Sequence, residues 1–324
     1  MGLDDPVRWG FLSTADINDK LLPGANASPD LDVIAVASRE LERARAYADE
    51  RGIERAYGSY DELLADPEID AVYISLPNSM HVEWSIRALE AGKHVLCEKP
   101  LSRNPDDVER AFDAAEQAGR LLMEAFMYRH NPQTKRLVEL VEGGAIGRLR
   151  LVRAAFSFPL ADTRNVRLNA DLEGGGLMDV GCYCVSGARL LAGEPESVFG
   201  EQVAAQSGVD ELFTGTLRFP GGVLAEIDCG LVLLRFTNPQ CRLPSQRIDD
   251  PWHCREPVLE VRREDGTERI ELEPVDSYRL QLENMSAAVR GESEPLLGRE
   301  DALGQARAIE ALYRSAEEGS SVSP

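Results

Sequence analysis

Short apolar runs alternate with helical segments through residues 1–125, and this rhythm constrains the fold more than any other feature of the chain. Such runs are typical of buried parallel strands whose crossover helices cover both faces of a sheet. Helix formers with apolar residues three to four apart predict helices over Glu40–Arg51 and Met80–Ala91. The predicted strands are Val7–Leu12, Asp32–Ser38, Ala71–Leu76, His94–Glu98 and Arg120–Glu124. The expected fold is a doubly wound parallel sheet, which binds ligands at the carboxyl ends of its strands.

A different pattern begins near residue 148, where apolar and polar residues alternate with period two. This pattern predicts a second α/β domain with one open, mostly antiparallel sheet. Its expected strands are Arg148–Phe158, Leu212–Phe219, Val223–Val232 and Val258–Arg263. Helical periodicity returns over Ser277–Glu317, and residues 234–256 are expected to form a long loop. We therefore predict a dinucleotide-binding domain at 1–125 and a substrate-binding domain at 126–324, with a C-terminal helix able to pack back on the first domain.

The charge of the chain excludes one class of partner. Its 56 acidic and 35 basic residues give a net charge of −21, and nucleic acid requires basic surfaces for its phosphates. No apolar run approaches the ~18 residues of a membrane span, and the N-terminus lacks a basic segment followed by an apolar core. Six scattered cysteines without a CxxC pair indicate reduced thiols. We expect a cytoplasmic protein with no membrane or nucleic-acid partner.

Only four of the basic residues are lysines. An acidic, lysine-poor surface suits a cytoplasm with very high salt, because screening weakens repulsion between carboxylates. Codon bias toward arginine is the alternative. Metal binding is not expected, since Cys241, His253 and Cys254 do not have the spacing of a tetrahedral zinc site.

The turn after the first predicted strand is a candidate phosphate loop. A G-x-G-x-x-G motif is expected there, but the chain has Ser13, Thr14, Ala15, Asp16 and Ile17. Small residues at 13 and 15 let the backbone approach a pyrophosphate, and the hydroxyls of Ser13 and Thr14 can bind phosphate. An ordinary strand-to-helix turn is the alternative.

The second predicted strand indicates which dinucleotide is bound. NAD sites usually end this strand with an acidic residue for the ribose 2′-hydroxyl, whereas NADP sites lack it and supply an arginine. The strand here ends in Ser38 and Arg39. This favours NADP, with both residues on the 2′-phosphate, although Glu40 follows closely and leaves NAD as the less favoured cofactor.

Several sequence blocks together resemble the glucose-fructose oxidoreductase/inositol dehydrogenase family, Gfo/Idh/MocA. They are RWGFLSTADI (8–17), SLPNSMH (75–81), AGKHVLCEKPL (91–101), EAFMYRHNPQ (124–133) and GGGLMDVGCYCV (174–185). The chain is most similar to the branch with trans-dihydrodiol dehydrogenase and NADP-dependent D-xylose dehydrogenase, whose loop often reads STA. The resemblance implies an N-terminal Rossmann domain and homodimers or homotetramers that pack through the C-terminal sheet.

The resemblance also implies site residues. Lys99 and Tyr183 would be the active-site lysine and the acid/base, with Asp179 orienting substrate from the same helix face four residues earlier. A tyrosine with a pKa of ~10 is a poor base, so a nearby cation such as Lys99 must favour its phenolate. The alternatives are a solvated Lys99, a core aromatic at 183 and a helix N-terminal acid at 179. Gly174–Gly176 would let backbone pass close to cofactor or substrate.

Further residues are implied near the cofactor. They are Leu76, Pro77, Asn78, His81, Glu98 and Arg129. For His81, the alternative is that it begins a helix and its ring packs in the protein interior. For Arg129, the alternative to a cofactor or substrate contact is an interdomain salt bridge. A cis bond before Pro100 would aim Lys99 into the cleft. Arg164, Asn165 and Arg167 are candidates for contacts with a polyhydroxylated substrate.

These features predict an NADP-dependent oxidoreductase acting on a small sugar or diol. D-xylose or a related aldose, oxidised at C1, is the leading substrate. Oxidation of an aromatic trans-diol and reduction of a keto-sugar are alternatives in the same class. A non-catalytic, nucleotide-sensing regulator is an alternative of another class, and it would not need the lysine, aspartate and tyrosine together.

Overall fold

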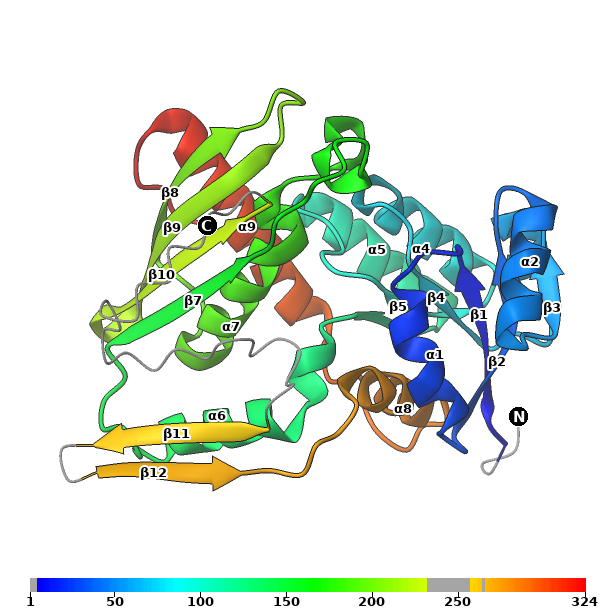
Figure 1. The fold of residues 1–324 in the computed structure, drawn as a ribbon, viewed down its shortest axis with the longest axis horizontal. Coiled ribbons are helices and arrows are strands. Elements are labelled where there is room, and N and C mark those ends of the chain that lie inside the picture. Colours follow the sequence, from blue (N-terminus) through cyan, green and yellow to red (C-terminus); the bar gives the residue numbers. More distant parts are fainter. Residues whose placement is uncertain (1–4, 232–256, 264–265) are drawn as a thin grey trace. The chain divides into compact units, whose positions relative to one another are not determined.

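The computed structural model describes residues 5–231, 257–263 and 266–324. The chain divides into two compact units, and each is assembled from two separate segments (Figure 1). Unit 1 comprises Met1–Met127 and Asp276–Ala306, and unit 2 comprises Tyr128–Val275 and Arg307–Pro324. The expected loop at 234–256, with Cys241, His253 and Cys254, lies outside the described residues.

A parallel six-stranded sheet forms the centre of unit 1, in the order β3–β2–β1–β4–β5–β6. Its strands are β1 (Val7–Leu12), β2 (Leu31–Ala37), β3 (Arg55–Tyr57), β4 (Ala71–Ile74), β5 (His94–Cys97) and β6 (Leu122–Glu124). The doubly wound Rossmann-like sheet is thus confirmed. The strand order changes direction between β1 and β4, and ligands bind outside the carboxyl ends of the strands at such a point.

The first helices of unit 1 alternate with its strands, and two more come from the C-terminal part of the chain. They are α1 (Asn18–Asn26), α2 (Leu41–Arg51), α3 (Tyr60–Leu64), the 3₁₀ turn η1 (Asn78–Met80), α4 (His81–Glu90), α5 (Pro105–Ala118), α8 (Ser277–Val289) and the first part of α9 (Arg299–Glu318). Local signals define α5: the side chain of Asn104 accepts a hydrogen bond from Asp106 N–H, Pro105 opens the helix, and Gly119 ends it with φ +60°.

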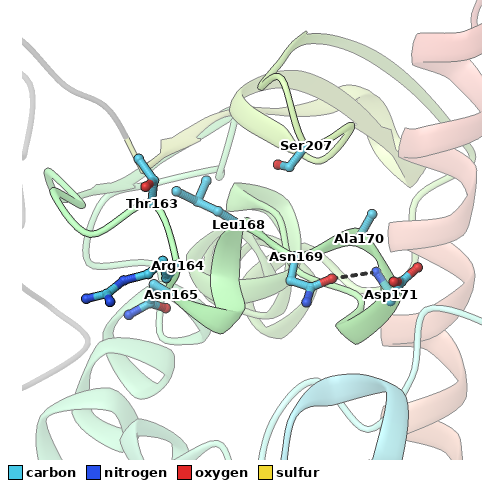
Figure 2. Close-up of a pocket in the computed structure, with 8 residues that line it drawn as sticks. All are labelled: Thr163, Arg164, Asn165, Leu168, Asn169, Ala170, Asp171 and Ser207. Atoms are coloured by element: carbon cyan, nitrogen blue, oxygen red, sulfur yellow. Dashed lines mark hydrogen bonds between the residues drawn. The ribbon is translucent and has the colours of Figure 1, made fainter.

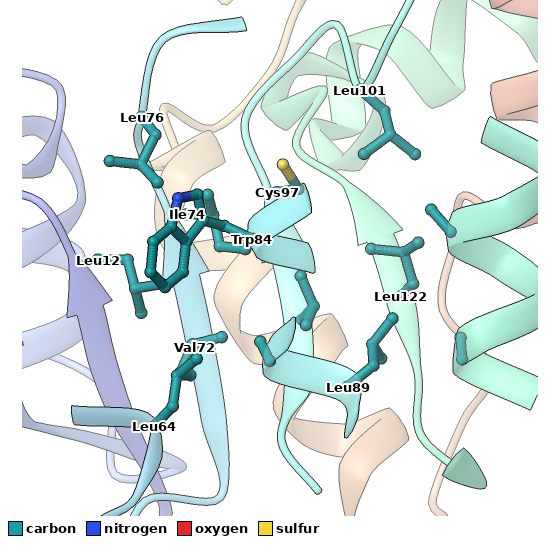
Figure 3. Packing of buried hydrophobic residues seen from close by; sticks show 14 of the residues in the cluster. Leu12, Leu64, Val72, Ile74, Leu76, Trp84, Leu89, Cys97, Leu101 and Leu122 are labelled. Atoms are coloured by element: carbon teal, nitrogen blue, oxygen red, sulfur yellow. The ribbon is translucent and has the colours of Figure 1, made fainter. Parts of the chain in front are cut away.

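Successive side chains of β1 point to opposite faces of the sheet, and both faces are packed. Leu12 joins a buried cluster with side chains of α3, α4, α5 and α9 (Figure 3). Trp9 faces the other way, and its indole Nε1 donates to Ser286 Oγ of α8 at 3.2 Å. Gly10 has no room for a side chain, because a Cβ would lie 2.8 Å from Leu63 Cδ2. The strand that leads to the phosphate loop is therefore packed on both sides.

A mixed, mostly antiparallel sheet forms the centre of unit 2, in the order β7–β10–β9–β8. Its strands are β7 (Leu151–Ser157), β8 (Ser197–Ala204), β9 (Asp210–Phe219) and β10 (Val223–Gly230). β9 pairs antiparallel with both neighbours, whereas β7 runs parallel to β10. The predicted open sheet is confirmed, but the expectation that Val258–Arg263 belongs to it is wrong. That strand, β11, pairs antiparallel with β12 (Gly266–Glu271), which follows closely in sequence and satisfies its hydrogen bonds in a separate two-stranded sheet.

The helical elements of unit 2 lie before, between and after its strands. They are η2 (Met127–His130), α6 (Pro132–Glu142), η3 (Val166–Leu168), η4 (Ala170–Leu172), the π-helix η5 (Leu177–Gly181), α7 (Cys182–Ala192), η6 (Pro220–Gly222) and the remainder of α9. The β10 residues Ala225, Ile227 and Cys229 are buried, whereas Glu226 and Asp228 between them are exposed. One face of the sheet is thus packed and the other is open. In the described part of the chain, no helix combines the length and apolarity needed to cross a bilayer.

Candidate functional site

Four polar residues lie at the carboxyl edge of the unit 1 sheet. Ser13 follows β1, Ser38 follows β2, Ser75 follows β4 and Glu98 follows β5. Because these strands are parallel, the four residues lie at one edge. Ser13, Ser75 and Glu98 come from the quoted sequence blocks, and Ser38 ends the predicted strand that favoured NADP.

Ser13 takes a backbone conformation that favours glycine, with φ +128°. Its buried hydroxyl lies 3.0 Å from Ser75 O and 2.8 Å from Ser75 Oγ, and it accepts from Ala15 N–H at 3.1 Å. The structure thus gives this hydroxyl partners inside the protein in place of the expected phosphate. Of the remaining loop residues, Thr14, Ala15 and Ile17 are half-buried and Asp16 is exposed.

An arginine that the sequence reasoning missed lies beside the loop. Arg43 of α2 donates from Nε to Thr14 Oγ1 at 2.8 Å. Arg39 lies four residues before it, ahead of the helix, and is exposed, while Ser38 is buried. Burial raises the pKa of Tyr60, and the positive charges of Arg39 and Arg43 oppose that rise. The four-residue spacing of two arginines after the second strand was the available signal.

The SLPN segment leads from β4 into η1 and α4. Leu76 is buried, whereas Pro77 and Asn78 are half-buried. His81 begins α4 as expected, with its ring nitrogens 2.8 Å from Leu76 O and Pro100 O. Burial lowers the pKa of His81, and its side chain is 1% exposed. The expectation of direct cofactor contact by His81 is therefore corrected: the ring joins two loops of the edge.

The EKP segment follows β5 at the same edge. Glu98 accepts a hydrogen bond from the hydroxyl of buried Tyr73, and Lys99 N–H donates to Glu98 Oε2 at 3.3 Å. The Lys99–Pro100 bond is cis, which confirms the expectation. Lys99 is half-buried. It belongs to unit 1, whereas Asp179, Tyr183 and Arg129 belong to unit 2.

Tyr183 lies in the first turn of α7, in an aromatic cluster of unit 2. Its ring centroid is 5.7 Å from that of Phe156 and 6.0 Å from that of Tyr128, and the side chain is 7% exposed. Tyr128 OH is 2.7 Å from Ser186 Oγ. The cluster fixes the direction of the Tyr183 ring.

Asp179 lies in the π-helix that precedes α7. A π-helix closes its hydrogen bonds over five residues, so the four-residue spacing to Tyr183 does not by itself place both on one face, as an α-helix would. Asp179 Oδ2 accepts from Arg167 Nε at 2.7 Å, and its side chain is 14% exposed. Arg167 is steadied in turn by Asn165, whose Oδ1 accepts from its backbone N–H.

The glycines before the π-helix pack against protein. A Cβ on Gly174 would lie 2.3 Å from Arg167 O, and one on Gly175 would lie 2.1 Å from Asp210 Oδ1. Gly175 also has φ +124°. These glycines were expected to admit a cofactor or substrate, but they bring the Arg167 turn and Asp210 against the helix start.

Asp210 is the second residue that sequence reasoning missed. Its Oδ2 accepts from Leu177 N–H at 2.6 Å, and its Oδ1 accepts from Tyr313 OH at 2.8 Å. Burial raises the pKa of this carboxyl to about 6. Asp210 opens a strand 33 residues from Leu177, so no local motif reveals the contact.

A polar pocket of about 310 Å³ lies beside these turns (Figure 2). Its lining includes the predicted Arg164 and Asn165, but not Arg167. Asn169 Oδ1 accepts from Asp171 N–H at 2.9 Å in its lining. The lining residues are Thr163, Arg164, Asn165, Leu168, Asn169, Ala170, Asp171 and Ser207.

Arg129 is a half-buried residue of η2, at the start of unit 2. Within the ranges that the structure describes, no three His, Cys, Asp or Glu side chains are grouped as metal ligands would be.

A Rossmann-like unit with a polar carboxyl edge, followed by a unit with an open, mostly antiparallel sheet, defines a two-unit oxidoreductase of the dinucleotide-binding class. Residues 8–126 match the oxidoreductase family GFO_IDH_MocA, described as an NAD-binding Rossmann fold, and residues 134–243 match the GFO/IDH/MocA C-terminal domain. The chain belongs to the Gfo/Idh/MocA family.

Three relatives illustrate the range of activities among similar proteins. The chain is 40% identical to D-xylose 1-dehydrogenase (NADP(+)) 2 of Haloferax volcanii, over 98% of this chain and 99% of that protein. It is 36% identical to trans-1,2-dihydrobenzene-1,2-diol dehydrogenase of Xenopus laevis, over 66% of each. The 3-ketoreductase KijD10 of Actinomadura kijaniata, solved with NADP and TDP-benzene, superposes with a TM-score of 0.85 at 32% identity, covering 96% and 98% of the two chains. Structures of KijD10 also include a tyrosine-to-phenylalanine variant and a lysine-to-alanine variant.

Proposed function

We propose that the protein is an NADP-dependent oxidoreductase that transfers a hydride between a sugar or polyol carbon and nicotinamide. The preferred reaction is oxidation of a D-xylose-like aldose at C1. Two features of the chain carry this proposal. Asp179 and Tyr183 are both held in place around the start of α7, and Lys99 lies just after the end of strand β5. The similarity to a xylose dehydrogenase supports the substrate class.

The proposed chemistry assigns one task to each side chain. The dinucleotide supplies the hydride acceptor. The C1 hydroxyl proton passes to the Tyr183 phenolate, while Lys99 stabilises that phenolate and the substrate oxygen by its positive charge. Asp179, held by Arg167, accepts a hydrogen bond from a second hydroxyl and orients the sugar.

The choice of NADP rests on the arginines beside the phosphate loop. Arg39 and Arg43 supply two positive charges near the end of β2, and Ser38 supplies a hydroxyl. Guanidinium groups pair strongly with a doubly charged phosphate, whereas a ribose 2′-hydroxyl offers them no charge. The cofactor of the xylose dehydrogenase relative and the NADP in the KijD10 structures support this choice. Thr14, Ala15, Asp16 and Ile17, with Leu76, Pro77, Asn78, Glu98 and Arg129, stay proposed cofactor contacts.

We propose further that the subunits associate through the open face of the unit 2 sheet, as a homodimer or homotetramer in the cytoplasm. Aligned residues cross this face from Arg153, through Glu226 and Thr216, to Phe199. Arg153 Nε and Glu226 Oε2 are 2.7 Å apart, and Phe199 and Val203 are 38% and 51% exposed. Light scattering of the wild type and of a Phe199→Glu variant would test this, with a monomeric wild type contradicting it.

A keto-sugar reductase and a trans-diol dehydrogenase are the second candidates, favoured by the KijD10 and diol dehydrogenase similarities. One panel separates the candidates: NADPH formation from pentoses, hexoses and trans-diols, and NADPH consumption with keto-sugars, each at low and at molar KCl. Activity highest with xylose supports the proposal. Turnover confined to diols or keto-sugars would replace it, and tight NADP binding without any turnover would favour a regulator.

A further inference from the structure

Three polar side chains form a closed hydrogen-bond ring at the switch point of the unit 1 sheet. Ser75 Oγ donates to Asn18 Oδ1 at 2.7 Å, and Asn18 Nδ2 donates to Ser13 O at 2.8 Å. Since the single hydroxyl hydrogen of Ser75 goes to Asn18, Ser13 Oγ donates back to Ser75, at 2.8 Å from Oγ and 3.0 Å from O. Asn18 is fully buried, and Ser13 and Ser75 are 9% and 7% exposed.

The ring joins three elements that each contribute one residue. Ser13 follows β1, Ser75 follows β4 and Asn18 is the first residue of α1. β1 and β4 are the neighbouring strands at which the sheet order changes direction. The ring therefore spans the crevice where a doubly wound sheet binds its ligand.

The ring includes Ser13, the loop residue whose backbone conformation is unfavourable for a residue with a side chain. Ser13 has φ +128°, a region in which a side chain is strained and glycine is not. Both its carbonyl and its hydroxyl are ring members. The hydrogen bonds thus hold a serine in the conformation that a glycine would adopt unaided.

The conformation of Ser13 also determines where the backbone N–H groups of the loop point. Ala15 N–H donates to Ser13 Oγ. The N–H groups of Thr14, Asp16 and Ile17 have no acceptor among the described residues, and they are the donors that a pyrophosphate takes at such a turn. Their directions depend on the Ser13 backbone.

We infer that Ser75 and Asn18 are positioning residues for dinucleotide binding, which replace the conformational freedom of the missing glycine by a hydrogen-bonded ring. The inference rests on the proposed dinucleotide function but not on the choice of NADP, because the pyrophosphate is common to NAD and NADP.

Calorimetric titration of NADP⁺ and NAD⁺ into the full-length protein tests this inference. Asn18→Ala should weaken the binding of both dinucleotides about tenfold, and Ser75→Ala about threefold because Ser75 O stays available to Ser13. Ser13→Gly should bind within about twofold of wild type, since glycine adopts φ +128° without strain. In the Ser13→Gly background, Asn18→Ala should cost less than about threefold.

Ser286→Ala is the matched control, because it removes a buried serine that accepts from Trp9 in the same unit. It should lower the melting temperature and leave both dissociation constants unchanged. Wild-type affinity in Asn18→Ala and Ser75→Ala would overturn the inference, as would an equal loss for Asn18→Ala in the wild-type and Ser13→Gly backgrounds. Tighter binding of NAD⁺ than of NADP⁺ by wild type would instead contradict the proposed cofactor.

Discussion

The proposed site residues fall into a unit 1 half and a unit 2 half, and different contacts hold each half in place. At the unit 1 edge, the key residues directly follow strands, and they bond to one another: Ser13 with Ser75, and Lys99 N–H with Glu98. At the start of α7 in unit 2, Asp179 depends on Arg167, and Leu177 depends on Asp210, 33 residues away. The first half is built by the parallel sheet itself, whereas the second requires loops that fold onto a helix. We expect substitutions to affect the two halves in separable ways.

The largest expected effect is on chemistry in unit 2. Tyr183→Phe removes only the proposed proton acceptor, so turnover should fall about 10²- to 10⁴-fold while the dissociation constant for NADPH stays near that of wild type. Stopped-flow kinetics and NADPH fluorescence titration measure the two quantities. Tyr128→Phe, a neighbour in the same cluster, is the control and should keep turnover within about threefold. Near wild-type turnover in Tyr183→Phe would remove this residue from the mechanism.

The next effect tests how strongly the unit 2 half depends on a distant carboxyl. The folded protein holds the pKa of Asp210 at about 6, above its ordinary value of 3.8, so the folded state binds the proton more tightly than the unfolded state. This group therefore lowers stability as pH rises from about 4 through 6.

Between pH 4.5 and 7.5, the wild type should lose about 2 kcal/mol of unfolding free energy relative to Asp210→Asn. Urea unfolding of both proteins at the two pH values measures the difference. Asp228→Asn, an exposed acid of the next strand, should show no such change. A pH dependence equal in wild type and Asp210→Asn would contradict the account.

A smaller effect concerns cofactor choice in unit 1. Arg43→Ala removes a charge from the proposed 2′-phosphate site, so kcat/KM with NADP should fall about tenfold and that with NAD should change less than about twofold. Steady-state kinetics with both cofactors gives the ratio. Arg45, an exposed arginine of α2 paired with Glu42, is the control. If Arg43→Ala lowered kcat/KM equally with NADP and NAD, Arg43 would not bind the 2′-phosphate.

The smallest effect should be shared by both halves. If the net charge of −21 reflects adaptation to high salt, the melting temperature should rise on the order of 5 °C between 0.1 M and 2 M KCl, because screening reduces repulsion between carboxylates. Thermal scans at increasing KCl measure it. A flat or falling curve would leave arginine-rich codon usage as the explanation.

The sequence predicted most of unit 1 because its strands are buried apolar runs with local boundaries. β3 was missed, since three residues carry no period. In unit 2, β8 was missed because Gly200 interrupts its alternation; a Cβ there would lie 2.7 Å from Leu312 O of α9. The π-helix, Asp210 and the Arg167 contact were also beyond sequence reasoning, since each depends on residues that only the folded chain brings together.

The division of each unit into two chain segments has a consequence for synthesis. Residues 1–127 contain every strand of the parallel sheet, yet Trp9 lacks Ser286, and the Leu12 cluster lacks Ala302, Leu303 and Ala306, until the last part of the chain is made. A nascent chain leaving the ribosome must therefore keep a partly uncovered sheet while residues 128–275 of the other unit are translated. Because the sheet is only partly covered during that time, we expect folding in the cell to depend on chaperones. We also expect N-terminal fragments to express poorly.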